Sequence, residues 1–439
     1  RVGALQIEPT RAAGGRTLDR VIQLVEEAQT VKAPTERFTD RFERVFVPVV
    51  LVSAVALAVA PPLLGIWSWS TALYRSMALL VAASPCALAI GTPSAVLAGI
   101  AQTARNGVLI KGGVHLEKLG AVAALAMDKT GTLTVGRPEV SDVVPASAVS
   151  EDELLTIAAA VERNSQHPLA EAVVREAEER GLELPEAGDL ESVTARGVRS
   201  TVQGTTVEIG SLRLWEKANV TVPDEIRSGV DRLAESGRSV MAVRYGDRWL
   251  GTLGVSDRPR TGVAAVLDQI RALGVGTLIM ITGDNEGVAR AIAREVGIDE
   301  VHADLLPEDK VGAVQALLDR HGDVAMIGDG VNDAPALATA TVGIAMGGAG
   351  TAAALETADV ALMGDELAGI PFAIGLSRQT RRIIQQNLAI SLGVIALLIL
   401  ATTTGLFGIG PAVLVHEGST LLVVGNALRL LRYRNGLEG

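Results

Sequence analysis

The sequence predicts a membrane protein with two transmembrane helical hairpins flanking a doubly wound α/β domain, into which an α+β domain is inserted. Three observations lead to this fold class. Long segments almost free of charge occur in pairs near both ends of the 439-residue chain. Between them, three short apolar runs each end in a sequence rich in Asp and Gly. The first two of these runs are separated by a stretch with mixed helix-like and strand-like patterns. Together these features match a sheet with chemistry at its strand ends, tethered to a membrane.

The composition narrows the possible function. Hydrophobic residues make up 48% of the chain and charged residues 20%, which excludes a disordered protein. The net charge is −11 and aromatic residues are only 3%, so nucleic-acid binding is not expected. Cys86 is the single cysteine, which excludes an internal disulfide and fits a reducing, cytosolic environment.

The start of the chain shows no signal-peptide pattern, because residue 1 is Arg and no basic segment precedes a short apolar one. Leu18–Ala28 has the apolar spacing of a helix. We expect the chain to be a fragment that lacks an N-terminal part; a processed mature terminus is the alternative.

Four segments are long enough to cross a bilayer. The first has 22 residues without charge, or about 33 Å of helix, against a bilayer core of about 30 Å. Two others contain one charge each, Arg75 and Glu417. The segments are Val45–Ile66, Thr71–Ala104, Ile383–Ala401 and Pro411–Leu428, and the connectors Trp67–Ser70 and Thr402–Gly410 join them into two hairpins.

The charges beside the hairpins predict their orientation. Three basic residues lie before and after each hairpin. Before and after the first they are Arg37, Arg41, Arg44 and Arg105, Lys111, Lys118; before and after the second they are Arg378, Arg381, Arg382 and Arg429, Arg432, Arg434. By the positive-inside rule these ends and the region between the hairpins are cytoplasmic. We expect Arg75 to extend to the outer interface near Trp67 and Trp69. Four buried helices of a soluble enzyme are the alternative, which the segment lengths disfavour.

The middle region predicts a parallel sheet with acidic residues at neighbouring strand ends. Ala121–Met127 leads into Asp128, Gly276–Ile281 into Thr282-Gly283-Asp284, and Val324–Ile327 into a segment containing Asp329 and Asp333. The helical stretches between them are Gly262–Leu273 and Lys310–Arg320.

Clustered carboxylates at one sheet edge need a cation, and Mg²⁺ suits an oxygen site that also holds phosphate. Gly131, Gly283, Gly328 and Gly330 would let backbone N–H groups approach phosphate oxygens. An aspartate there can become an aspartyl-phosphate. An ordinary Asp-Gly turn is the alternative at each position, but three such turns directly after apolar strands are improbable.

The motifs DKTGTLT at Asp128–Thr134, TGD at Thr282–Asp284 and GDGVNDAPAL at Gly328–Leu337 resemble the phosphorylation domain of P-type ATPases, which has a haloacid-dehalogenase-like (HAD-like) fold. The resemblance implies that Asp128 is phosphorylated and that Mg²⁺ is bound by Asp128, Asp329 and the carbonyl of Thr130. It also implies that Lys310 contacts the phosphoryl group. The remaining residues of the implied site are Lys129, Thr282, Asp284, Asn332 and Asp333.

The inserted stretch has a helix-like segment Glu151–Arg163 and strand-like runs around Val193–Val207. Its Ser165–Ala170 sequence resembles the nucleotide-binding domain of heavy-metal P-type ATPases. The resemblance places Glu162, His167 and Gly197 at the adenine of ATP. Ala195 stands where the family usually has glycine, so we expect an effect on nucleotide affinity. A helix start is the alternative role of His167-Pro168.

Two membrane motifs suggest a metal path. Ser84-Pro85-Cys86 interrupts the second span, and His416-Glu417 lies in the fourth, followed by Thr420. Thiolate, imidazole and carboxylate suit Zn²⁺ or Co²⁺. The motifs resemble the cobalt/zinc subgroup of the heavy-metal (type IB) pumps. We expect Cys86 and Glu417 to be the main ligands, with His416, Ser84 and Thr420 nearby. Alternatives are a buried apolar role for Cys86, an interfacial His416 and helix pairing by Glu417.

The resemblance implies ATP-driven export of Zn²⁺ or Co²⁺, with Cd²⁺ and Ni²⁺ as further substrates, by a monomer in a bacterial plasma membrane. The cofactors are ATP and Mg²⁺, and the partners are the metal and membrane lipid. A membrane-tethered phosphatase of the same fold and a non-enzymatic metal-binding membrane protein are the alternatives. We find no Thr-Gly-Glu loop of an actuator domain, so we expect this chain not to complete a transport cycle.

The expected divisions are an actuator tail and linker (1–36), a transmembrane hairpin (37–104), the first part of the phosphorylation domain (105–137), the nucleotide-binding domain (138–250), the second part of the phosphorylation domain (251–376), a transmembrane hairpin (377–432) and a tail (433–439).

Overall fold

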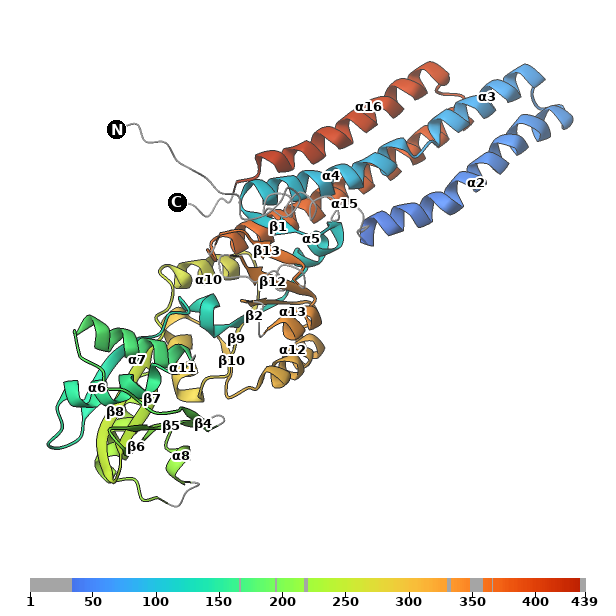
Figure 1. Ribbon diagram of the computed structural model, residues 1–439. Helices are drawn as coiled ribbons and strands as arrows, with labels where there is room; N and C mark the ends of the chain where they lie inside the picture. Colours follow the sequence, from blue (N-terminus) through green and yellow to red (C-terminus); the bar gives the residue numbers. More distant parts are fainter. Residues whose placement is uncertain are drawn as a thin grey trace, which may run out of the picture.

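The computed structural model describes residues 34–434, except 166, 194–195, 217–219, 330–332, 348–357 and 365. The predicted helix Leu18–Ala28 and two predicted features, Asn332 and Ala195, therefore lie outside the described residues. A bundle of long helices forms one end of the molecule, and two sheets with their covering helices form the other (Figure 1).

The helical bundle contains the predicted hairpins. Among the described residues, three helical segments are long and apolar enough to cross a membrane: α2 (Pro34–Leu63), the segment Trp69–Arg105, and α15 (Gly369–Thr403). The fourth predicted span is α16 (Ile409–Leu428), which packs against α15 and α4. Its 20 residues match the thickness of a bilayer core, and it carries His416 and Glu417 near its middle.

The second predicted span is two helices, because Pro85 interrupts it. The chain leaves α3 (Trp69–Ala82) and enters α4 (Cys86–Arg105), and Pro85 lies in the irregular turn between them. Proline has no N–H to donate and its ring crowds the preceding turn, which ends a regular helix. This break puts Cys86 at the first residue of a helix in the middle of the bundle.

The sheet nearest the bundle has the strand order β1-β13-β12-β11-β2-β9-β10, and only β1 runs antiparallel to its neighbour. Its strands are β1 (Val108–Ile110), β2 (Ala124–Asp128), β9 (Thr277–Ile281), β10 (Glu300–His302), β11 (Val324–Gly328), β12 (Val342–Met346) and β13 (Val360–Leu362).

Helices cover both faces of this sheet. Leu125 and Met127 pack with α10 (Val263–Ala272) and α11 (Glu286–Val296), whereas Ala124 and Ala126 pack with α12 (Pro307–His321) and α13 (Ala334–Thr339). Alternate residues of a strand point to opposite faces, so both faces of β2 are buried. The predicted doubly wound α/β fold is confirmed.

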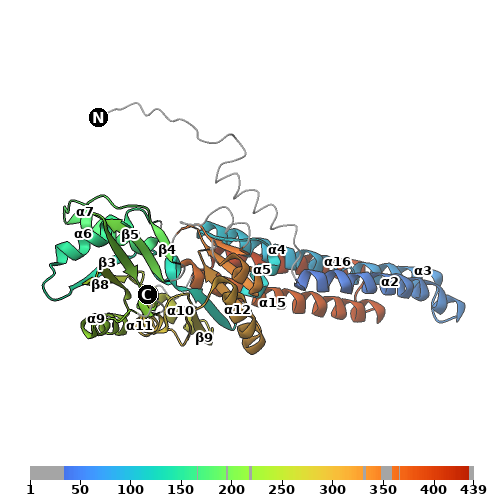
Figure 2. The same cartoon turned by 60° about the horizontal axis from the view of Figure 1, so that its bottom comes forward.

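The inserted region forms an antiparallel sheet of order β3-β8-β7-β6-β5-β4. Its strands are β3 (Glu139–Pro145), β4 (Glu191–Val193), β5 (Gly197–Val202), β6 (Thr205–Gly210), β7 (Ser239–Tyr245) and β8 (Arg248–Ser256). Two helices, α6 (Glu151–Glu162) and α7 (Pro168–Glu179), share its main core. A second core includes α8 (Arg213–Glu216) and α9 (Asp224–Glu235). Figure 2 shows this sheet at the end of the molecule away from the helical bundle.

The helix α15 joins the first sheet to the bundle. It packs against α10, β1 and the short helix α5 (Gly113–Leu119) at one end and against α3, α4 and α16 at the other. Near its start, the guanidinium of Arg378 donates to the carbonyls of Val122 at 3.1 Å and Gly274 at 3.4 Å. These carbonyls precede β2 and β9, so α15 is fastened to the two strands that carry predicted site residues.

Candidate functional site

Asp128 ends β2 at the carboxyl edge of the parallel sheet. β2 pairs with β9 on one side and β11 on the other, with Asp128 opposite Ile281 and Met127 opposite Ile327. This register puts Thr282 and Gly328, each at the end of its strand, beside Asp128. The close packing also explains Gly328, where a Cβ would lie 2.6 Å from a carboxylate oxygen of Asp333.

Lys310 joins two of the aspartates. Its Nζ donates to Oδ1 of Asp128 at 2.6 Å and to Oδ1 of Asp333 at 2.7 Å. All three residues are buried, with 8%, 6% and 1% of their surfaces exposed. Burial alone would lower the pKa of Lys310, but the two carboxylates raise it above its ordinary value. Lys310 therefore stays charged and compensates the acidic pair.

Burial, followed by the charge of the neighbouring Asp333, raises the pKa of Asp128 to about 7; Asp329 adds to this shift and Lys310 opposes it. The negative charge of this site is thus incompletely compensated by protein groups. Carboxylate and carbonyl oxygens with surplus negative charge fit Mg²⁺. Asp128, Asp329 and the carbonyl of Thr130 are the residues that would hold it.

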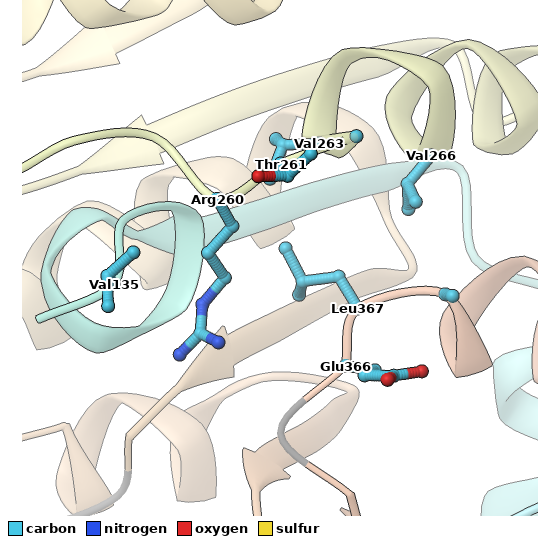
Figure 3. Close-up of a pocket in the computed structure, with 9 residues that line it drawn as sticks. Val135, Arg260, Thr261, Val263, Val266, Glu366 and Leu367 are labelled. Atoms are coloured by element: carbon cyan, nitrogen blue, oxygen red, sulfur yellow. The ribbon is translucent and has the colours of Figure 1, made fainter.

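The turn after Asp128 is held in a non-helical shape. Gly131 has φ of +73°, and Thr130 is extended. Arg260 donates from Nη2 to the carbonyl of Gly131 at 2.8 Å and from Nε to that of Thr134 at 3.1 Å. Figure 3 shows its side chain extending from the start of α10 between Val135 and Leu367. Arg260 was not among the sequence-predicted site residues.

Asp257 fixes the other side of the same turn. It accepts hydrogen bonds from the Thr134 hydroxyl at 2.5 Å and from the Gly136 N–H at 3.1 Å. Asp257 and Arg260 lie in the segment where the chain returns from the insert to the first sheet. Its charged Asp-Arg-Pro-Arg sequence, directly after an apolar strand, is the signal that could have identified them.

A second lysine–aspartate pair lies on the β9 side. Lys129, which is 5% exposed, places Nζ 2.6 Å from Oδ2 of Asp284. The Asp284 N–H donates to the hydroxyl of buried Thr282 at 3.2 Å. The predicted residues Lys129, Thr282 and Asp284 are therefore brought together beside Asp128.

A cavity of about 230 Å³ connects this edge with the inserted domain. Its lining includes Lys129, Thr130 and Asp284 from the first sheet and His167 from the insert. His167 is exposed, and its Nδ1 accepts a hydrogen bond from the Leu169 N–H at 3.2 Å, which caps α7. The residue thus has a structural role as well as the predicted one.

The other predicted nucleotide residues lie in the insert. Glu162 ends α6 and is 5% exposed; burial raises its pKa to about 7, although Ser165 partly opposes this. Gly197 begins β5, where a Cβ would overlap the carbonyl oxygen of Ile209 on the adjacent strand. Close strand pairing therefore explains this glycine without a ligand.

Within the bundle, the Ser84 Oγ and Cys86 Sγ atoms lie 3.0 Å apart at the helix break. His416 on α16 is buried at 4% exposure, and its Nε2 has no hydrogen-bond partner among the described residues. Glu417 is exposed, since successive helical residues are about 100° apart. Thr420 is half-buried, and its hydroxyl lies 3.4 Å from the His416 carbonyl.

This arrangement differs from the expected ligand order. Among the described residues, no three His, Cys, Asp or Glu side chains gather in a way that could hold a metal ion. The two expected main ligands do not lie in the same environment. Cys86 begins a helix inside the bundle, whereas Glu417 lies on an exposed helix face. Of the two adjacent residues His416 and Glu417, it is His416, expected as a secondary ligand, that is buried.

Comparison with known proteins agrees with both halves of the fold. A family model described as haloacid dehalogenase-like hydrolase matches residues 122–341. The chain is 44% identical over 437 residues to a probable cadmium-transporting ATPase of Staphylococcus aureus strain MRSA252, covering 99% of this chain and 60% of that protein. It is also 44% identical to a zinc/cadmium/lead-transporting P-type ATPase of Escherichia coli K12, covering 98% of this chain and 57% of that protein.

A crystal structure of a zinc-transporting PIB-type ATPase in the E2.Pi state is similar over 96% of this chain and 68% of its own, with a TM-score of 0.75 and 44% identity. The chain thus spans about 60% of the length of the curated relatives it matches.

Proposed function

Because this chain belongs to the heavy-metal-transporting (type IB) P-type ATPases, we propose that it is the catalytic and metal-conducting part of an ATP-driven exporter of divalent transition metals. The observation that carries the proposal is the position of Asp128. It ends a buried strand beside Lys310, at the sheet edge from which a cavity leads to the inserted domain.

In the proposed reaction, an oxygen of Asp128 attacks the γ-phosphorus of ATP. A bond from this oxygen to phosphorus forms, the bond from phosphorus to the bridging oxygen of ADP breaks, and ADP leaves. Lys310 and Lys129, each within 2.6 Å of a site carboxylate, would then face the phosphoryl oxygens. Mg²⁺, when bound by Asp128, Asp329 and the Thr130 carbonyl, would offset the negative charge of the phosphates.

The inserted domain is proposed to bind the nucleotide. Glu162 and His167 would contact the adenine, and the cavity between His167 and Lys129 would hold the phosphate chain. Arg260 and Asp257 would act as positioning residues for the turn after Asp128. Arg260 holds the carbonyls of Gly131 and Thr134, and Asp257, which also lines the cavity, accepts from Thr134 and Gly136. The domain divisions remain as predicted from the sequence, except that the insert would extend beyond residue 250 to the end of β8 at Ser256.

The transported ion is proposed to be Zn²⁺, with Cd²⁺ and Pb²⁺ as further substrates, since the relatives are named for these metals. Co²⁺ stays a prediction from the Ser-Pro-Cys and His-Glu motifs. Cys86 and the inward-facing His416 would be direct ligands, with Ser84 and Thr420 as oxygen donors. Glu417 would supply charge near the path rather than a bond in the described arrangement.

The two hairpins are proposed to lie in a bacterial plasma membrane with the sheets in the cytoplasm. The long apolar helices and the basic residues at their ends support this orientation. A tethered phosphatase of the same fold would not need the insert or the metal motifs. A metal-binding protein without catalysis would not need the lysine-compensated aspartates.

The test is incorporation of label from γ-labelled ATP by the purified chain in detergent with Mg²⁺. We expect an acid-stable, hydroxylamine-labile phosphoprotein that Asp128→Asn abolishes. Asp319→Asn, on the exposed face of α12, is the matched control and should label normally. Labelling of Asp128→Asn at the level of Asp319→Asn would refute the proposal. Stimulation of labelling by Zn²⁺ would favour a pump over a phosphatase.

A further inference from the structure

The start of α3 lies at the end of the helical bundle farthest from the sheets (Figures 1 and 2), and a separate polar cavity is found there. It has a volume of about 360 Å³ and is lined by the start of α3 and by the loop between α15 and α16. Under the proposed orientation this end faces the non-cytoplasmic surface. None of the predicted catalytic, nucleotide or metal residues lines it.

Arg75 is the charged group of this cavity. Its guanidinium stacks on the ring of Trp67, with 4.3 Å from the guanidinium carbon to the ring centroid, and Nη1 donates to the Thr403 carbonyl at 3.3 Å. The stacking fixes the plane of the guanidinium. A guanidinium has five N–H donors, so donors remain for a ligand.

No acidic side chain compensates this charge within the chain segments that form the cavity. There is no Asp or Glu in the membrane segments and connectors around Arg75, which are residues 45–74, 76–104 and 383–416. An arginine without an acidic partner at a membrane surface attracts an anion, because desolvation near the apolar phase strengthens charge pairing.

The other groups of the cavity also favour an anion. Ser70 and Thr71 supply hydroxyls, and each lies within 3.0 Å of the Ser68 hydroxyl that caps α3. The Tyr74 hydroxyl accepts from the Ile409 N–H at 3.1 Å, at the first residue of α16. Thus α3 and α16, of 14 and 20 residues, both begin at the cavity and direct the positive ends of their dipoles toward it.

The loop between α15 and α16 is shaped around the two side chains. A Cβ at Gly408 would lie 2.6 Å from the Tyr74 hydroxyl, and one at Gly405 would lie 2.7 Å from Nη2 of Arg75. Gly405 also has φ of +81°. Larger residues at these positions would push the loop away from Arg75 and change the cavity.

We propose that this cavity binds a phosphate group through the guanidinium of Arg75 and the hydroxyls around it. The planar donor fork of arginine matches phosphate oxygens, whereas the same set of positive groups repels a metal cation. At the membrane surface the phosphate can come from a phospholipid headgroup or from free phosphate in solution. The inference is independent of the proposed pump reaction, since it involves none of its residues.

The test measures binding by native mass spectrometry of the whole chain in a neutral detergent without Mg²⁺. The two probes are dihexanoylphosphatidylglycerol, below the concentration at which it forms micelles, and inorganic phosphate. The variants are Arg75→Gln, Arg75→Lys and, as a matched control at the opposite end of the same broken helix, Arg105→Gln. Circular dichroism establishes that each variant is folded.

We expect saturable binding to the wild type and to Arg105→Gln. Loss of a charge-assisted hydrogen bond should weaken binding about tenfold or more in Arg75→Gln and less in Arg75→Lys. Arg75-dependent binding of the lipid alone assigns the site to headgroups, and Arg75-dependent binding of both probes assigns it to phosphate in general. Equal binding by Arg75→Gln and the wild type, or no saturable binding of either probe, would overturn the proposal.

Discussion

The ammonium group of Lys310 lies 2.6 Å from the carboxylate of Asp128, although 182 residues separate the two in sequence. The nucleotide-binding insert occupies most of that separation, so the contact forms only when the two parts of the first sheet assemble around it. Lys310 also lies 2.7 Å from Asp333. One side chain therefore joins β2, α12 and the segment before α13.

Replacing Lys310 with Met should abolish phosphorylation and destabilise the protein. The substitution leaves Asp128 and Asp333 buried without a cation, and removal of one partner of a buried ion pair typically costs about 3–5 kcal/mol of unfolding free energy. Denaturant unfolding of the variant measures this loss. The double variant Lys310→Met with Asp333→Asn should recover part of the stability but not the labelling by ATP. If the stability does not recover, Lys310 stabilises the protein through packing and not through its charge.

Arg260→Gln should slow phosphorylation about 10- to 100-fold while leaving nucleotide affinity nearly unchanged, as expected for a group that only positions reacting atoms. The reason is that the turn of Gly131 loses the hydrogen bonds that hold its carbonyls. Rapid-quench labelling measures the rate, and equilibrium dialysis measures the affinity. Arg258→Gln is the control, because this neighbouring side chain is 76% exposed and its ion pair is with the exposed Glu139. Equal slowing in both variants would contradict a specific role for Arg260.

His167→Ala should weaken ATP binding, but it also removes the cap of α7. His167→Asn separates the two roles, because asparagine is a good capping residue and has no imidazole. We expect both variants to bind ATP weakly and only His167→Ala to lose stability, by about 1 kcal/mol. Calorimetric titration and thermal unfolding supply the two measurements. Normal ATP affinity in His167→Asn would leave His167 with the capping role alone.

Glu162→Gln should stabilise the protein at pH 8 and have little effect near pH 4.5. Burial raises the pKa of Glu162 from 4.5 to about 7, so the folded state binds the proton more tightly than the unfolded chain does. The stability that this group contributes is present below pH 4.5 and is lost as the pH rises to 7. The difference is up to about 3 kcal/mol. Unfolding of both proteins across this pH range is the measurement, and a constant difference between them would exclude the shift.

His416→Ala should reduce Zn²⁺ affinity about tenfold or more, because its unpartnered Nε2 lies inside the bundle. Cys86→Ala should do the same, whereas Glu417→Gln should retain binding, since Glu417 faces outward. Metal titration in detergent compares the three variants. A larger loss in Glu417→Gln than in His416→Ala would restore the ligand order expected from the sequence.

Local sequence was sufficient to predict where three strands of the first sheet end, whereas β1, β10, β12 and β13 were not predicted. β2, β9 and β11 are continuous apolar runs, and parallel strands bring their carboxyl ends to one edge, so Asp128, Thr282 and Asp329 were expected as neighbours. The closeness of Arg75 to Trp67 was also expected, because an arginine beside an uncharged span extends toward interfacial aromatic residues, but its stacking on the Trp67 ring was not.

Other features depend on tertiary structure. His416 and Glu417 are adjacent, and α16 is apolar on most sides, so hydrophobic spacing does not indicate which of them faces the bundle. The hydrogen bonds of Arg260 to Gly131 and Thr134 join segments about 130 residues apart, and nothing in either segment specifies the partner. Lys310 was assigned from family resemblance, because it is 182 residues from Asp128 and no sequence pattern indicates that the two side chains meet.

The unbroken course of α15 has a mechanical consequence. At 1.5 Å per residue, its 35 residues form a rod about 52 Å long. Arg378 clamps one end to the carbonyls before β2 and β9, and the Thr403 carbonyl at the other end receives the hydrogen bond of Arg75. A tilt of a few degrees imposed at the strands would be magnified into a displacement of several ångströms at the far tip. The helix can thus act as a lever whose short arm is held at the start of β2, the strand that ends in Asp128, and whose long arm extends past the break at Pro85.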